Sequence, residues 1–67
     1  MNTVTYVRRF AGNEPEKTVC SYEDAEQLLK EDEAECQSYG ETIAKGEGWF
    51  TATNPKTGDS VTYTILK

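Results

Sequence analysis

Carboxylates are the side chains of this 67-residue chain that could most readily do chemistry, because twelve Asp and Glu residues stand against seven Lys and Arg. Four of them crowd into five positions, at Glu31, Asp32, Glu33 and Glu35. Such a run could supply a general acid and a general base. An acidic run on a helix is more often a solvated face, and the sequence gives no sign of a cleft. We therefore expect a protein that is not an enzyme.

The remaining reactive residues point the same way. Histidine is absent, which excludes serine–histidine and cysteine–histidine nucleophiles and removes the commonest zinc nitrogen ligand. Cys20 and Cys36 do not form a CxxC pair, and the glycines form no phosphate-binding loop. We expect neither a metal nor another cofactor. A helix running from about Tyr22 past Cys36 would separate the cysteines by roughly 20 Å, so a disulfide and that helix exclude each other.

Length and charge restrict the partners. Residues 1–67 are enough for a single small domain with one core. The net charge of −5 disfavours direct binding to nucleic acid or a membrane, because both are anionic. A basic protein is the natural partner, although acidity is also an ordinary route to solubility. No apolar run resembles a signal peptide or a membrane span, so we expect a cytoplasmic protein.

The elements that must position these residues begin with a strand. Alternating β-branched and aromatic residues predict it over Thr3 to Phe10. Gly12, Asn13 and Pro15 then provide turn chemistry. A short second strand over Glu16 to Cys20 would close a hairpin, but the pattern leaves its existence open.

A helix follows the first hairpin. Ser21 and Asp24 have the spacing of a helix start, in which the Ser21 hydroxyl accepts from the Asp24 amide. A helix that continued to Gly46 would overhang so small a domain. We therefore predict that it ends near Tyr39, with Gly40 in the left-handed conformation that favours glycine.

Two strands, Gly48 to Thr53 and Ser60 to Leu66, surround a turn that contains Pro55 and Gly58. Pairing Thr53 with Ser60 gathers the apolar residues on one face. The predicted fold is α+β, with one helix packed on one face of a three- or four-stranded, mostly antiparallel sheet, in the order β-(β)-α-β-β.

Two charged residues break the apolar pattern. Asp32 lies within the apolar stripe of the helix, and Arg8 lies between Tyr6 and Phe10 on the core side of the first strand. Either charge is costly if it is buried alone. One hypothesis is that Arg8 and Asp32 form an ion pair where helix and sheet meet. The alternative is that the helix bends or ends near Asp32 while Arg8 extends to the edge of the sheet.

Trp49 is the third departure from pattern. The expected register puts it on the open face of the sheet among threonines, and an exposed tryptophan is a common anchor of protein interfaces. The alternatives are that Trp49 is a covered edge residue, or that the register shifts by one and Trp49 replaces Phe50 in the core.

These patterns favour a non-catalytic protein-binding module. The contact residues that we expect are Trp49, Thr51, Thr62, Thr64 and Leu66 on the sheet, and Glu31, Asp32 and Glu35 on the helix. A sharper version is a small acidic inhibitor or decoy of a nucleic-acid-handling protein, in which helix carboxylates imitate phosphates. The alternative is a self-associating structural domain, a homodimer that pairs its open faces or edge strands.

Overall fold

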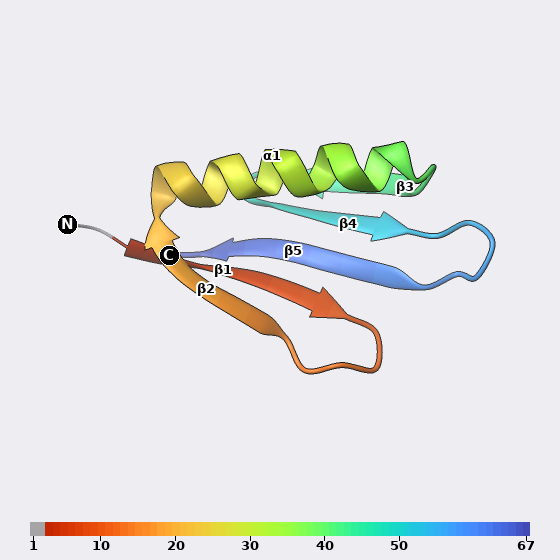
Figure 1. Ribbon diagram of the computed structural model, residues 1–67, viewed down its shortest axis with the longest axis horizontal. Helices are drawn as coiled ribbons and strands as arrows, with labels where there is room; N and C mark the ends of the chain where they lie inside the picture. The colour runs from red at the N-terminus through yellow and green to blue at the C-terminus, as the bar shows by residue number, and fades with distance from the viewer. Residues whose placement is uncertain (1–2) are drawn as a thin grey trace.

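The computed structural model describes residues 3–67, which form a five-stranded antiparallel sheet with one helix on one of its faces (Figure 1). The elements are β1 (Thr3–Phe10), β2 (Glu16–Ser21), α1 (Tyr22–Ser38), β3 (Thr42–Gly46), β4 (Trp49–Thr53) and β5 (Ser60–Leu66). The sheet order is β2-β1-β5-β4-β3. The fold is α+β as predicted, but the prediction of three or four strands was wrong, because one more strand follows the helix.

That additional strand is β3, which pairs antiparallel with β4 along its whole length. Glu47 and Gly48 form the two-residue turn between them, and Gly48 has a φ of 77°, a conformation that glycine adopts at little cost. Ile43 packs against the core from this strand. It is the only large apolar residue in β3, so the alternation was too weak to identify a strand from the sequence.

The other strand predictions hold closely. β1 and β5 have the predicted bounds, and β4 begins at Trp49 instead of Gly48. The second strand, which the sequence left open, does form and runs to Ser21. Phe50 pairs with Tyr63, so the predicted register of the C-terminal hairpin is confirmed.

The helix begins and ends for local reasons that were visible in the sequence. At its start, the Ser21 hydroxyl accepts a hydrogen bond from the Asp24 amide at 3.2 Å. At its end, Tyr39 caps the helix and Gly40 has a φ of 77°. Within residues 3–67 no helix is long and apolar enough to cross a membrane.

The core lies between α1 and the sheet. Tyr6 and Phe50 are fully buried there, and the Phe50 and Tyr63 rings stack at a centroid distance of 4.6 Å. Val7 is also fully buried, but it lies on the opposite side of the sheet. The cluster is completed by residues from every strand of the sheet and from the helix, with Ala25 and Cys36 as the buried residues of α1. This side of the sheet is called the helix side below.

The opposite side, called the open face, is not covered by the helix (Figure 1). The pairing register assigns its residues strand by strand. They are Thr3, Thr5, Val7 and Arg9 of β1, Lys17, Val19 and Ser21 of β2, Thr42, Ala44 and Gly46 of β3, Trp49, Thr51 and Thr53 of β4, and Ser60, Thr62, Thr64 and Leu66 of β5.

Candidate functional site

An ion pair joins the middle part of α1 to strand β1 of the sheet. Arg8 Nε lies 3.0 Å from the Asp32 carboxylate, and the Tyr6 hydroxyl donates to the same Asp32 oxygen at 2.6 Å. The structure therefore brings Arg8 and Asp32 together and adds Tyr6 as a second donor. Burial, reinforced by the hydrogen bond to Asp32, raises the pKa of Tyr6 far above its ordinary value. The phenol is protonated at neutral pH, as an ordinary tyrosine is, and the raised pKa extends its role as a hydrogen-bond donor to alkaline pH.

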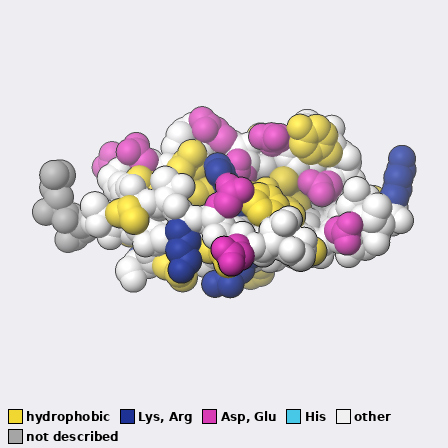
Figure 2. All heavy atoms as spheres, turned by 60° about the horizontal axis from the view of Figure 1, so that its bottom comes forward, with side chains coloured by type: hydrophobic (Ala, Val, Ile, Leu, Met, Phe, Trp, Pro, Cys, Tyr) yellow, Lys and Arg dark blue, Asp and Glu magenta, His cyan; other side chains and the backbone are white. Residues whose placement is uncertain are grey.

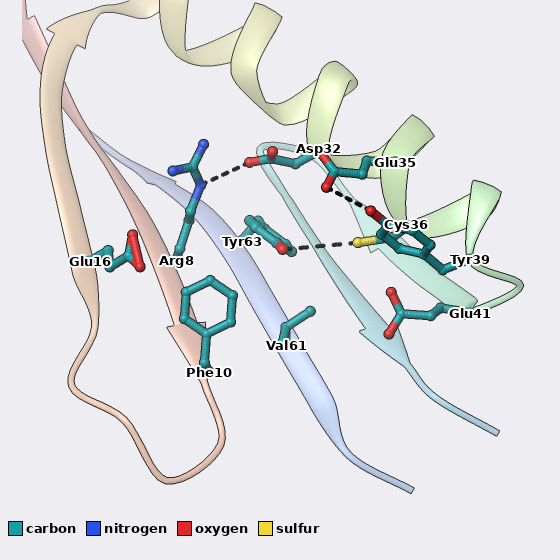
Figure 3. A pocket seen from close by; sticks show the side chains of 10 residues that line it. All are labelled: Arg8, Phe10, Glu16, Asp32, Glu35, Cys36, Tyr39, Glu41, Val61 and Tyr63. Carbon is teal, nitrogen blue, oxygen red and sulfur yellow. Dashed lines mark hydrogen bonds and ion pairs between the residues drawn. The ribbon is translucent and has the colours of Figure 1, made fainter. Parts of the chain in front are cut away.

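A groove of about 440 Å³ opens beside this ion pair, under the C-terminal half of α1 (Figure 3). We call it the acidic groove. Its floor is formed by Phe10, Val61 and Tyr63, where β1 ends and β5 begins. Four carboxylates line it, those of Glu16, Asp32, Glu35 and Glu41, together with Arg8, Cys36 and Tyr39.

The acidic groove has more negative charge than its own cation can neutralise. Within residues 3–67 the ion pairs are those of Arg8 with Asp32 and of Lys45 with Glu33. Glu16, Glu35 and Glu41 therefore face the groove without a cationic partner among the described residues. Glu35 accepts a hydrogen bond from the Tyr39 hydroxyl at 3.3 Å, but that donor is uncharged. The groove can attract a cation whose apolar portion also fits the floor.

Cys36 is the groove residue with nucleophilic potential, but its environment keeps the thiol neutral. Its side chain is buried and lies 3.9 Å from the Tyr63 hydroxyl. Burial raises the pKa of Cys36 to about 11, so the thiolate that would be the nucleophile is scarce at neutral pH. Cys20 is also free and is half-buried. Within residues 3–67 no cluster of three or more Cys, Asp and Glu side chains could hold a metal ion.

The open face carries the other group of predicted contact residues. Trp49 is 40% exposed there, which excludes the register shift that would have put it in the core. Its indole lies across Gly46, where an added Cβ would come within 2.5 Å of Nε1. Thr51 and Thr62 share a hydrogen bond at 3.2 Å between their hydroxyls.

Two further apolar side chains are exposed on this face, Leu66 at 46% and Val19 at 70%. Thr64 lies between Trp49 and Val7 in the pairing register. All five sheet residues predicted as contacts therefore share one surface, and α1 lies on the other side of the sheet.

The three helix residues predicted as partner contacts do not all lie at the acidic groove. Asp32 and Glu35 line the acidic groove, whereas Glu31 is exposed outside it and accepts from the Gln27 amide at 3.5 Å. Asp32 is already engaged by Arg8 and Tyr6, which leaves Glu35 as the predicted groove carboxylate that has no ion pair among residues 3–67.

Sequence reasoning did not identify most of the groove lining. The residues that it missed are Phe10, Glu16, Cys36, Tyr39, Glu41, Val61 and Tyr63. Glu16 could have been found, because it is the cross-strand partner of Arg8 in the first hairpin. Glu41 lies after the helix in a segment whose path the sequence did not reveal.

Charge separates the two sides of the molecule. The helix carries seven acids and one lysine, whereas the described strands place no acid on the open face, where Arg9 and Lys17 are the charged residues. Figure 2 shows acidic side chains bordering exposed hydrophobic atoms near the middle of the view.

Comparison with known proteins adds no relative: no protein-family model, no curated protein and no solved structure matches this chain.

Proposed function

We propose that this chain is a non-catalytic protein-binding module that holds a basic protein through the acidic groove and the neighbouring carboxylates of α1. One observation carries the proposal. Three carboxylates that have no cationic partner in the described part of the chain surround an apolar floor. A basic side chain entering the groove would gain both charge complementarity and apolar contact.

A more specific form of the proposal is a small acidic inhibitor or decoy of a nucleic-acid-handling protein. A surface that binds phosphates is basic, and the carboxylates of α1 offer such a surface an alternative anion. Glu31 and Glu35 support this form because they are exposed on the same helix. In this form, the module and the nucleic acid compete for the same protein.

Affinity capture from the native host tests the proposal. The tagged chain is compared with Glu35→Gln/Glu41→Gln, which removes two groove charges, and with Trp49→Ala on the open face. We expect basic proteins that are recovered at low salt, released at high salt and lost with the groove variant. Equal recovery by the wild type and the groove variant would contradict the proposal. Release of the captured protein by added nucleic acid would support the decoy form.

A second candidate function is self-association through the open face. Trp49, Leu66 and Val19 are exposed on that face, and β2 is an edge strand. A two-fold arrangement would cover these apolar side chains. Light scattering separates this candidate from the first, because a mass independent of concentration argues against it and a dimer broken by Trp49→Ala supports it.

A further inference from the structure

We infer that the acidic groove receives an arginine side chain of the partner protein. This inference rests on the proposed binding function and specifies the chemistry of the same site. It follows from the apolar floor, the arrangement of the carboxylates and a guanidinium that the protein itself already holds at the edge of the groove.

The floor suits a side chain with a long apolar stem. Phe10 and Val61 are paired residues on adjacent strands, and the Phe10 ring meets the Tyr63 ring edge-on at 6.3 Å. Tyr39, 71% exposed, adds an aromatic ring at the wall. Arginine is weakly hydrated, and its planar guanidinium stacks on aromatic rings, whereas the lysine ammonium is a strongly hydrated point charge.

The unpaired carboxylates come from opposite sides of that floor. Figure 3 shows Glu16 on one side, and Glu35 and Glu41 on the other. They belong to β2, α1 and the segment after α1 respectively. A guanidinium presents five N–H donors in a fixed fork and can bridge separated acceptors. A groove of about 440 Å³ falls within the usual range for a ligand site, roughly 300–1,000 Å³.

Arg8 shows that this environment holds a guanidinium. Its Nε donates to Asp32, and its Cζ lies 5.4 Å from the centroid of the Tyr6 ring. An incoming arginine would find the same two kinds of contact in the groove, which is lined by carboxylates and aromatic rings. Asp32 offsets the charge of Arg8, so the three remaining carboxylates of the groove stay available to the arginine of the partner protein.

Titration of the full-length isotope-labelled chain with three short peptides tests this inference. The peptides have the same glycine–serine backbone and carry three arginines, three lysines or three neutral citrullines. Chemical shifts of the Phe10, Tyr39 and Tyr63 rings report the groove, and the Trp49 indole reports the open face. The groove variant is Glu35→Gln/Glu41→Gln. The matched control, Glu23→Gln/Glu26→Gln, removes the same charge from the other end of α1.

We expect the arginine peptide to shift the groove rings and to bind at least about tenfold more weakly to the groove variant, with less than a twofold change for the control. The lysine peptide should bind more weakly than the arginine peptide. Equal losses of affinity in the two variants would overturn the inference, but they would still be consistent with binding by the acidic surface of α1 as a whole. Equal affinity for lysine would overturn the choice of arginine. Binding of neither cationic peptide would overturn the inference, and capture of no basic protein would remove the proposed function as well.

Discussion

The two sides of the sheet differ in charge and depth as well as in apolar content. The open face exposes Trp49, Leu66 and Val19, and the described strands contribute no acidic side chain to it. The helix side instead provides a groove, because α1 stands over the sheet and leaves Phe10 and Val61 only partly covered. An exposed tryptophan therefore does not by itself define a site. A groove that combines apolar floor with unpaired charge specifies what can enter it.

The largest expected effect is in the core beneath that groove. Phe50 is fully buried and stacks on Tyr63, so Phe50→Ala should lower the free energy of unfolding by about 3–5 kcal/mol. Trp49 is the preceding residue in the chain and lies on the open face. Because it is partly exposed, Trp49→Ala should lower the free energy of unfolding by only about 1 kcal/mol. Urea denaturation measures both free energies of unfolding. Equal losses for the two variants would mean that Phe50 and Trp49 are buried to the same extent.

Loss of the ion pair between Arg8 and Asp32 should give the next largest decrease in stability. Asp32→Ala leaves the Arg8 guanidinium and the Tyr6 hydroxyl without their acceptor. We expect a loss of about 2 kcal/mol, below the ~3–5 of a fully buried pair, because the Arg8 side chain is 30% exposed.

The double variant Arg8→Met/Asp32→Leu should recover most of that loss, because an apolar pair requires no desolvated charge to be matched. Chemical denaturation of both variants provides the measurement. If Asp32→Ala were as stable as the wild type, the ion pair would contribute nothing measurable to the stability of the fold.

Alkaline pH should destabilise the helix side through three buried groups. Burial raises the pKa of Cys36 from 9.0 to about 11 and raises the pKa of Tyr6 and Tyr63 above 10.0. Each group is protonated in the folded state and ionises earlier in the unfolded state. Stability is therefore full below about pH 9, falls between about pH 9 and 11 through the thiol, and falls further above pH 10 through the tyrosines.

The slope should reach about 1.4 kcal/mol per pH unit for each ionising group. Denaturation curves at stepped pH measure it, with Cys36→Ala as the control that flattens the first part of the decline. A stability that does not change up to pH 11 would contradict the burial of these groups.

The smallest expected effect is on the open face. Gly46→Ala places a Cβ 2.5 Å from Trp49 Nε1, so the indole must move away from β3 and become more exposed. We expect a red shift of tryptophan fluorescence with a stability change of about 1 kcal/mol or less. An unchanged spectrum would mean that the ring does not rest on Gly46.

The sequence predicted those parts of the fold that have strong local signals. The Ser21 cap, the glycine at position 40 and the turn between β4 and β5 each determine a boundary by their own backbone chemistry. β3 was missed because a five-residue strand with one large apolar side chain is stabilised by pairing with β4, not by its own pattern.

The candidate site was predictable only in part, for a related reason. Arg8 and Asp32 break their own local patterns, so opposite charge was enough to suggest that they meet. Glu16 and Glu41 break no pattern, and they reach the groove because of strand register and the path of the chain after the helix. Convergence of that kind depends on tertiary structure, which no spacing along the chain records.

Binding through the acidic groove can be tested by measuring the affinity of the captured partner for three forms of the chain with titration calorimetry. These forms are the wild type, Glu35→Gln/Glu41→Gln in the groove and Trp49→Ala on the open face. We expect at least about a tenfold loss of affinity for the groove variant and less than a twofold change for Trp49→Ala. A loss confined to Trp49→Ala would instead mean that the partner binds the open face and not the acidic groove.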